Sequence, residues 1–540
     1  MIDNIELKNF RKFKHLPELN FSDINLFVGG NNAGKSTLAK AIILVLDNLM
    51  NMKSTTPTNI FAGMHPSFDF SSDLHDLHIG SFDKAFCKYG KKEEGIVFKF
   101  LSNGTSYEIH VNQIGDRSFI SELILRGEVC NTEITFNFEK GEITINADSE
   151  EDSTSKSLAE QKKSLEMRIA ATKAAQTLET NLENAAKRQE EIVVLQSELS
   201  KLEKNRSADH FSIRVPLTLH ISRANQPLVA NLLESLRKYA DSPVTGVKKS
   251  SKAYSEQKAN KDLLKKWFDD YSETFLDGLD EDIRGFDIAY VPAHAASQKM
   301  VFSAKDTSDY LSQTIHEFYK ERIVEGDAEY SFIMRWLGKE GVGETTGFDI
   351  ADSFKINNIE EEAYTFNVYK DGETYPLASM GMGSVQVVIL LLKLATIWRR
   401  SRLKDAYGPL IFLEEPEQNL HPNWQSKLLD VFLDFNKSFD ASLADPDFPP
   451  QMFIETHSEY LVRRSEVLVA ESQYASEEIL DTNCPFMVLF FQDDDEEPVY
   501  EMQYSLTGRF EGRKFGQGFY DEAGRLALTL SKLERRRNSL

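Results

Sequence analysis

Residues 24–37 have the sequence INLFVGGNNAGKST, and this stretch decides the fold. The apolar run Ile24 to Val28 precedes a glycine-rich turn, and a helical pattern extends from Lys35 to about Leu49. A short apolar run of this kind is typical of a buried strand. The turn from Gly29 to Thr37 matches the P-loop pattern, which lies between a strand and a helix. The stretch therefore predicts a β-turn-α unit that binds a nucleotide phosphate.

The chemistry of phosphate binding explains each residue type in this turn. Glycines let backbone N–H groups turn toward phosphate oxygens, and the helix that begins near Gly34 adds the positive end of its dipole. We expect Lys35 to reach the β- and γ-phosphates of ATP and the Ser36 hydroxyl to bind Mg²⁺. The residues of this turn that we predict to bind nucleotide are Gly29, Asn31, Asn32, Ala33, Gly34, Lys35, Ser36 and Thr37.

Two further apolar strands lead into polar side chains. Leu410 to Leu413 precedes Glu414 and Glu415, and Met452 to Ile454 precedes His457. Ligands of a parallel sheet bind at the carboxyl ends of its strands. We therefore predict that Glu414 binds Mg²⁺ through water and that Glu415 orients or deprotonates the attacking water. A role for His457 as hydrogen-bond partner of the γ-phosphate follows from the same position, although a lone histidine is more often structural.

A glycine-containing loop, SMGMGS at residues 379–384, precedes a strongly apolar helical pattern that extends to Trp398. Its glycines free the backbone, and a serine beside a helix N-terminus can bind phosphate. We predict nucleotide contacts from Ser379, Gly381 and Gly383. The alternative is an ordinary loop in front of a buried helix.

Composition limits the function classes. The chain has 540 residues, 62 Lys and Arg and 85 Asp and Glu, so its formal net charge is −23. Such a surface repels phosphate, and nucleic-acid contact would need a local basic patch. The basic cluster Lys248, Lys249 and Lys252 fits a solvated loop. Three separated cysteines without a CxxC pair, and apolar runs too short for a membrane span, predict a cytoplasmic protein without membrane contact.

We expect an α/β protein built from three parts. Residues 1–150 hold the P-loop and antiparallel strands, because residues 94–146 alternate with period two. Residues 151–285 form a helical insertion, in which 155–206 lacks Gly and Pro and has an amphipathic pattern. This pattern predicts either a projecting coiled-coil arm or two packed helices. Residues 286–540 alternate strands with helices, which predicts a parallel sheet.

Together these motifs resemble the ABC-type ATPase head of SMC and RecF proteins. In that class ATP binds between two heads. The resemblance implies that Ser379 and Gly381 of one copy contact the γ-phosphate held by Lys35 of the other, so that ATP binding closes a homodimer or a higher homo-oligomer. Asn9 to Phe13 resembles the N-terminal element of the class, in which a basic residue, here Arg11, lies near the nucleotide base.

The pattern EEPE at residues 414–417, followed by LHP at 420–422, resembles the OLD-like branch. Too little chain follows His457 for a TOPRIM nuclease, and we do not expect the acidic stretch at Asp493 to bind a catalytic metal. The stretch GQGFYDEA at residues 516–523 resembles the closing segment of members without a nuclease, and with it the chain resembles the PtuA family of ATPases from Septu and retron-associated antiphage systems. That resemblance implies a separate HNH nuclease of the PtuB type, and permits a reverse transcriptase with its RNA–DNA product. A RecF-like clamp or loader on DNA, and a transporter ATPase subunit, are the competing hypotheses.

Overall fold

The computed structural model describes most of the chain outside the predicted coiled coil. The described residues are 1–50, 55–57, 64–71, 77, 79–127, 132–148, 210–217, 227–270, 272, 275–276, 279, 287–293, 299–306, 309–404, 408–440, 449–475, 484–494, 496–505, 507–516, 519–520 and 525–532. The choice between a projecting arm and two packed helices for residues 155–206 therefore lies outside the described residues.

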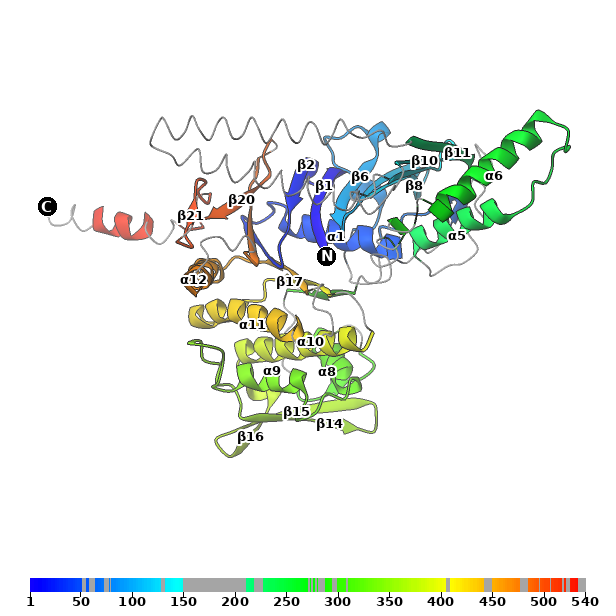
Figure 1. Cartoon of the computed structure of the whole chain (residues 1–540). Coiled ribbons are helices and arrows are strands. Elements are labelled where there is room, and N and C mark those ends of the chain that lie inside the picture. Colours follow the sequence, from blue (N-terminus) through cyan, green and yellow to red (C-terminus); the bar gives the residue numbers. More distant parts are fainter. Residues whose placement is uncertain are drawn as a thin grey trace.

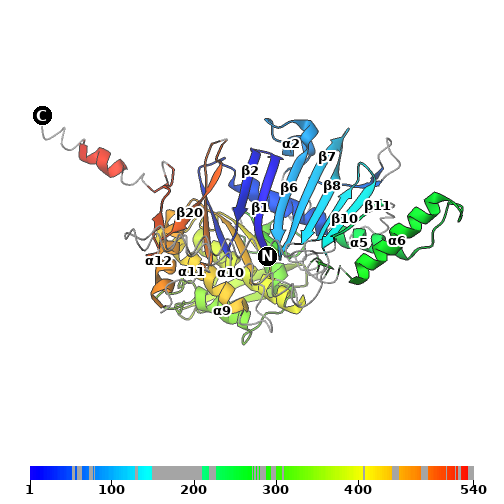
Figure 2. The same ribbon diagram turned by 45° about the horizontal axis from the view of Figure 1, so that its top comes forward.

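The first layer is an antiparallel sheet of eight strands in the order β11-β10-β9-β8-β7-β6-β1-β2 (Figure 2). Every second residue along the middle strands is buried, as the period-two pattern of residues 94–146 predicts. The strands are β1 (Ile2–Phe10), β2 (Phe13–Asn20), β6 (Ile96–Ser102), β7 (Thr105–Ile114), β8 (Arg117–Gly127), β9 (Thr132–Asn137), β10 (Glu142–Asp148) and β11 (His210–Pro216).

The second sheet has seven strands in the order β12-β17-β18-β3-β19-β20-β21. The first five strands are parallel to one another, and β20 and β21 are antiparallel to their neighbours. The strands are β3 (Ile24–Gly29), β12 (Ile288–Val291), β17 (Leu410–Glu414), β18 (Gln451–Glu455), β19 (Phe486–Phe491), β20 (Val499–Tyr504) and β21 (Phe510–Glu511). The predicted α/β class with a parallel sheet is confirmed.

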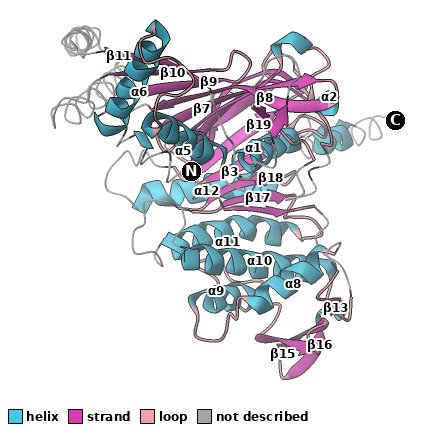
Figure 3. Cartoon of the chain, turned by 90° about the vertical axis from the view of Figure 1, so that its right-hand side faces the viewer, coloured by secondary structure: helices cyan, strands magenta, loops and turns pink. Residues whose placement is uncertain are grey.

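Helix α1 (Lys35–Met50) lies between the two sheets (Figure 3). Because it is covered on both sides, nearly all its residues from Leu38 to Leu49 are buried, including Asp47 and Asn48. Alternate residues of the seven-stranded sheet enter opposite cores. Phe412 and Phe453 pack on the α1 side. The residues directly before and after each of them along its strand pack on the opposite side. This two-sided burial explains why these strands are continuous apolar runs.

Helices and a small sheet cover the other face of the seven-stranded sheet (Figures 1 and 3). The helices are α8 (Tyr310–Lys320), α9 (Ala328–Leu337), α10 (Met382–Lys404), α11 (Pro422–Asp440) and α12 (Glu459–Ala475), and the small sheet contains β13 (Phe302–Ser303), β14 (Ser353–Ile359), β15 (Ala363–Lys370) and β16 (Glu373–Pro376). Helix α10 is long and apolar enough to cross a membrane over Met382–Arg402, but 72% of that window is buried inside the protein, as in a core helix.

The remaining described elements are peripheral. Helices α5 (Leu228–Asp241) and α6 (Lys252–Asp270) pack together beside β11 and bury Leu232 and Trp267 in the core that contains α1. The short elements are β4 (Thr55–Pro57), β5 (Met64–Pro66), α2 (Phe82–Ala85), η1 (Lys92–Glu94) and η2 (Leu377–Ser379). The division of the chain at residues 150 and 285 stays a prediction.

Some local expectations differ from the structure. The sequence suggests one strand from Ala363 toward Ala378, but the structure forms the β15–β16 hairpin. Asp371 and Gly372 at its turn have φ angles of 50° and 81°, the positive values that a two-residue hairpin turn requires. Helix α10 also begins two residues earlier and ends later than the apolar pattern, because its last turns are polar.

Candidate nucleotide-binding site

The strand order brings the predicted catalytic residues to one edge of the seven-stranded sheet. Strand β3 ends in the P-loop, β18 lies next to it and leads into His457, and β17 lies next to β18 and leads into Glu415. Because all three strands are parallel, their carboxyl ends meet at the same edge. Three segments, of which the first and last are 422 residues apart from Lys35 to His457, thus form one site.

Two P-loop glycines are required by geometry. Gly29 has φ of 141°, and a Cβ there would lie 2.1 Å from the Phe491 carbonyl oxygen of β19. Gly34 has φ of 113°, and a Cβ there would lie 2.7 Å from Cζ of Phe13. Gly30, in contrast, has no atom within 4 Å of its Cβ position. The turn therefore closes against β19 and β2 and is open above Gly30.

Lys35 lies inside the turn that it follows. Its Nζ donates hydrogen bonds to the carbonyl oxygens of Gly29 and Gly30, each at 3.0 Å. The side chain is buried, and this burial lowers the pKa of Lys35, although the nearby carboxylates of Glu455 and Glu415 act in the opposite direction. The ammonium group is thus held where P-loop phosphates bind. Its N–H donors contact two carbonyl oxygens, and phosphate oxygens can take the place of these acceptors.

Glu415 is held in a strained backbone conformation beside His457. Its φ is 43°, in the left-handed region, and its N–H donates to the Glu455 carbonyl oxygen at 2.9 Å. Oε2 accepts a hydrogen bond from Gln418 Nε2 at 2.6 Å, and Oε1 lies 3.7 Å from His457 Nε2. The structure therefore brings the predicted base and the predicted γ-phosphate contact together, and it adds Gln418 as a residue that orients the base.

Glu417 contacts the backbone of His457. Its Oε1 accepts a hydrogen bond from the His457 backbone N–H at 2.8 Å, and its burial raises the pKa of its carboxyl. Burial also lowers the pKa of the His457 imidazole, an effect that Lys35 reinforces and Glu415 opposes. A neutral imidazole can donate one hydrogen bond to a phosphate oxygen.

Glu414 lies on the α1 side of the sheet and contacts the neighbouring strand. Oε2 accepts a hydrogen bond of 3.4 Å from the Ala293 backbone N–H, and Glu414 also accepts one from the Tyr290 hydroxyl of β12. Burial and this carboxylate raise the pKa of Tyr290. Tyr290 was not predicted as a site residue, since nothing in β12 by itself marks it.

Glu455 is a second residue that sequence reasoning missed. It ends β18, it is only 5% exposed, and its Oε2 accepts a hydrogen bond of 2.6 Å from the Ser36 hydroxyl. Burial raises the pKa of Glu455 to about 7. Its position could have indicated it, because a carboxylate that ends an apolar strand is rare, and this one stands two residues before His457.

The turn between β1 and β2 reaches the P-loop through Lys12. Lys12 Nζ lies 3.2 Å from the Asn32 carbonyl oxygen and 2.6 Å from Oδ1 of Asp493. Asp493 thus belongs to an ion pair in the structure. Arg11 is half-buried in the same turn, with φ of 49°. Its predicted contact with the nucleotide base stays a prediction.

The loop at residues 379–384 presents an open surface. Ser379 and Gly381 are exposed, and no atom lies within 4 Å of a Cβ placed on Gly381. The Ser379 hydroxyl donates to the Pro376 carbonyl oxygen at 2.7 Å. Gly383 instead packs closely, because a Cβ there would lie 2.7 Å from the Asn419 carbonyl oxygen.

The donor set fits a magnesium nucleotide. Among the described residues the edge offers the Ser36 hydroxyl and the carboxylates of Glu414 and Glu455, together with a buried Glu455 oxygen, Oε1, that has no hydrogen-bond partner. Carboxylate and hydroxyl oxygens are ligands that Mg²⁺ accepts. The open space over Gly30 and the carbonyl-bound ammonium of Lys35 fit phosphate oxygens.

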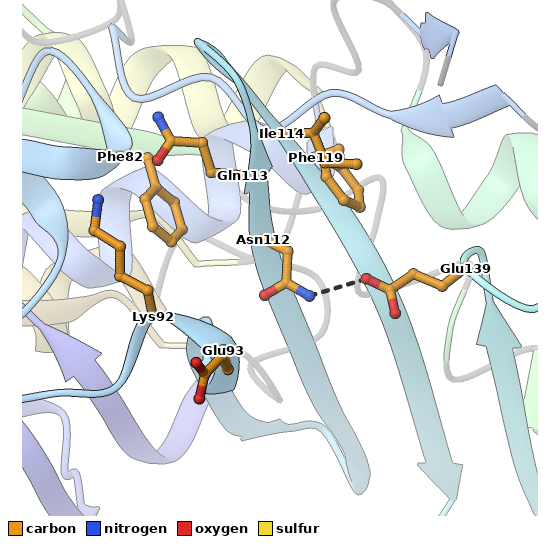
Figure 4. A pocket seen from close by; sticks show the side chains of 8 residues that line it. All are labelled: Phe82, Lys92, Glu93, Asn112, Gln113, Ile114, Phe119 and Glu139. Atoms are coloured by element: carbon orange, nitrogen blue, oxygen red, sulfur yellow. Dashed lines mark hydrogen bonds between the residues drawn. The ribbon is translucent and has the colours of Figure 1, made fainter. Parts of the chain in front are cut away.

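A separate hollow lies on the eight-stranded sheet (Figure 4). Asn112 of β7 bonds Glu139 across it at 3.1 Å. It is lined by Phe82, Lys92, Glu93, Asn112, Gln113, Ile114, Phe119 and Glu139. None of these residues belongs to the predicted nucleotide site.

A comparison with protein families agrees with this geometry. The family described as the AAA ATPase domain matches residues 1–462, which include the P-loop, both glutamates of the β17 end and His457. The chain belongs to the AAA ATPase domain family. No curated relative matches it.

Several solved structures resemble this AAA ATPase domain weakly. The Smc head domain of Pyrococcus furiosus, bound to the C-terminal domain of ScpA, is 11% identical, with 93% of this chain and 96% of that chain covered and a TM-score of 0.29. The SMC head domain from Thermotoga maritima is 11% identical over 93% and 99%, with a TM-score of 0.31. The RecF–ATP structure is 12% identical over 93% and 97%, with a TM-score of 0.24. Because these TM-scores are low, the assignment of the chain to its family rests on the family match and on the geometry of the site.

Proposed function

We propose that this protein is an ATP-hydrolysing head of the ABC/SMC type that closes as a homodimer around ATP and Mg²⁺. One observation carries the proposal. Lys35, Glu415 and His457 come from three separate segments, yet they meet at one edge of a parallel sheet, with 3.7 Å between Glu415 Oε1 and His457 Nε2. A phosphate-binding lysine and a residue that positions the attacking water are groups that phosphoryl transfer to water uses, and a neutral histidine can donate a hydrogen bond to a phosphate oxygen.

Each residue has a distinct task in this proposal. The backbone N–H groups after Gly29 and the N-terminus of α1 hold the phosphates, and Lys35 exchanges its two carbonyl partners for phosphate oxygens. Glu415, oriented by Gln418, accepts the proton of the attacking water, and His457 donates to the γ-phosphate. Ser36, and Glu414 through water, would hold Mg²⁺, which would supply positive charge beside the phosphate oxygens.

The dimer is inferred from the position of the loop at residues 379–384. Ser379 and Gly381 are exposed, whereas Gly383 is closed against Asn419, so the first two residues are available to a second copy. In the proposed dimer the Ser379 hydroxyl leaves Pro376 and donates to the γ-phosphate bound by the partner copy. Because each ATP then contacts both copies, ATP binding stabilises the dimer and hydrolysis releases it.

We further propose that the dimer serves antiphage defence in the cytoplasm and controls a separate HNH nuclease. The support is the resemblance of the EEPE and LHP patterns, and of the stretch at residues 516–523, to PtuA ATPases. The same resemblance permits a reverse transcriptase with its RNA–DNA product as a further partner. No nuclease activity is expected from this chain itself.

The ATPase proposal is tested with purified protein and radiolabelled ATP. Wild type should release phosphate in the presence of Mg²⁺, and Lys35→Ala should lose ATP binding and turnover. Lys84→Ala, an exposed lysine of α2 outside the nucleotide site, is the control and should retain both. Equal turnover in wild type and Lys35→Ala would contradict the proposal.

The defence proposal is tested by co-expression with the products of the neighbouring genes. A stable HNH protein should co-purify with this chain, and host protection from phage should require Lys35. If instead no neighbour binds and the chain alone binds gapped duplex DNA in an ATP-dependent and salt-sensitive way, the function is that of a RecF-like clamp or loader.

A further inference from the structure

The edge of the seven-stranded sheet carries a further acidic group besides Glu414, Glu415 and Glu417. Glu455 ends β18 and is the register partner of Glu414 on β17. Phe412 and Phe453, two residues earlier on the two strands, both pack on the α1 side. Because side chains alternate along a strand, Glu414 and Glu455 point to that same side, toward the start of α1.

Glu455 contacts the hydroxyl that a P-loop uses for its metal ion. The Ser36 hydroxyl donates to Glu455 Oε2 at 2.6 Å. The other oxygen, Oε1, is buried and has no hydrogen-bond partner, although the residue is only 5% exposed. A buried carboxylate oxygen is rarely left without a partner. We therefore expect a cation or a polar ligand to bind at Oε1.

Lys35 does not fill this place. Its Nζ binds the carbonyl oxygens of Gly29 and Gly30, and it attracts Glu455 only through space, as Lys40 of α1 also does without an ion pair. When Lys35 turns to the phosphates of a bound nucleotide, its charge is matched by them. The buried Oε1 of Glu455 then still has no positive partner in direct contact.

We propose that Glu455 is a protein group of the magnesium site and supplies, with Glu414 and Ser36, the negative charge that holds the divalent ion. This inference rests on the proposed function, since it requires a P-loop that binds nucleotide with Mg²⁺. Glu455 also orients the Ser36 hydroxyl. The two tasks are separable, because a glutamine at position 455 keeps a hydrogen-bond acceptor for Ser36 and loses only the charge.

The test uses the full chain, Mn²⁺ as the probe and a non-hydrolysable ATP analogue. Mn²⁺ binding is followed by electron paramagnetic resonance, and analogue affinity is measured separately in EDTA. Glu459→Gln is the matched control, because it removes the same charge four residues later from a side chain that pairs with Arg463. A thermal melt of each variant checks that it is folded.

We expect Glu455→Gln to weaken Mn²⁺ binding to the nucleotide-bound protein by about tenfold or more, the size typical of losing a group that supports a metal site. Its analogue affinity in EDTA should equal that of wild type, and Glu459→Gln should bind Mn²⁺ as wild type does. Glu455→Asp, which keeps the charge, should retain part of the Mn²⁺ affinity.

Unchanged Mn²⁺ affinity in Glu455→Gln would overturn the inference and leave Glu455 with the orientation of Ser36 only. This outcome is distinct from a failure of the proposed function, in which wild type itself would bind neither the analogue nor Mn²⁺. If Glu455→Gln does not fold, Glu455→Asp decides. Its Mn²⁺ affinity must then fall while its analogue affinity in EDTA stays at the wild-type value.

Discussion

At the scale of single residues, the base assignment depends on Glu415. Its left-handed backbone and its bond to Gln418 place the carboxylate 3.7 Å from His457. We predict that Glu415→Gln binds ATP with wild-type affinity and hydrolyses it about 10²- to 10⁴-fold more slowly, the usual contribution of a general base. Single-turnover kinetics measure the chemical step directly. Normal turnover in this variant would refute the assignment.

The P-loop glycines give a second prediction at this scale. Gly34 has φ of 113° and faces the Phe13 ring, so Gly34→Ala should strain the turn and weaken ATP binding by about tenfold or more. Gly246→Ala is the matched control, since Gly246 also has a positive φ of 80° but lies outside the P-loop and its Cβ would meet no atom within 4 Å. Titration with a fluorescent ATP analogue compares the two. Equal losses would show that the geometry of the loop is not what limits binding.

Much of the site is predictable from sequence because its residues follow apolar strands that are buried on both faces. Lys35, Glu415 and His457 each stand just beyond such a run, and the parallel order of the strands brings them together. Glu455 and Gln418 were not predicted, because their roles depend on contacts across strands and turns. Such contacts have no sequence period that would mark them.

At the scale of elements, the loop at residues 379–384 contains two glycines with different tasks. A Cβ on Gly383 would lie 2.7 Å from the Asn419 carbonyl oxygen, whereas Gly381 is open. We predict that Gly383→Ala lowers the free energy of unfolding by about 1–3 kcal/mol, as overpacking does, and that Gly381→Ala leaves it unchanged. Denaturant unfolding measures both. Equal stability of the two variants would contradict the packing of α10 on the loop after β17.

The eight-stranded sheet contains a pH-dependent contact. Hydrogen bonds from His110 and Arg126 lower the pKa of Glu108, on β7, to about 2 from an ordinary value near 4.5. Because the folded pKa is the lower one, the contribution of Glu108 to stability is complete above about pH 4.5 and is lost as the pH falls toward 2.

We therefore predict that Glu108→Gln destabilises the protein at pH 6 and has a much smaller effect near pH 3. Urea unfolding of both proteins at the two pH values is the measurement. Lys92 pairs with Asp83 at an exposed site, so Asp83→Asn is the surface control and should change stability little at pH 6. A Glu108→Gln effect of equal size at both pH values would contradict the ion-pair account.

The elements themselves were predictable to different degrees. The strands β3, β17 and β18 and the helix α1 match their sequence patterns closely, because each is buried on both sides. The β15–β16 hairpin was predicted as one strand, since only the backbone geometry of Asp371 and Gly372 reveals its turn. Strand β14 was missed altogether. Its residues are mostly half-buried and do not form an apolar run.

At the scale of the whole molecule, the layered arrangement explains how segments far apart in the sequence build one site. The eight-stranded sheet, α1, the seven-stranded sheet and the helices beyond it form successive layers (Figure 3). Strand β3 comes from the N-terminal part, and its neighbours β18 and β19 come from the C-terminal part. The chain between them can therefore vary in length without disturbing the nucleotide site.

The central claim is that ATP joins two copies of this chain. The most direct measurement is the molar mass of Glu415→Gln in solution by light scattering, with and without ATP and Mg²⁺, alongside the same protein carrying Ser379→Arg. We predict that ATP converts monomers of Glu415→Gln to dimers, and that the added Ser379→Arg blocks this change while ATP still binds. A protein that binds ATP and keeps its mass would contradict the account.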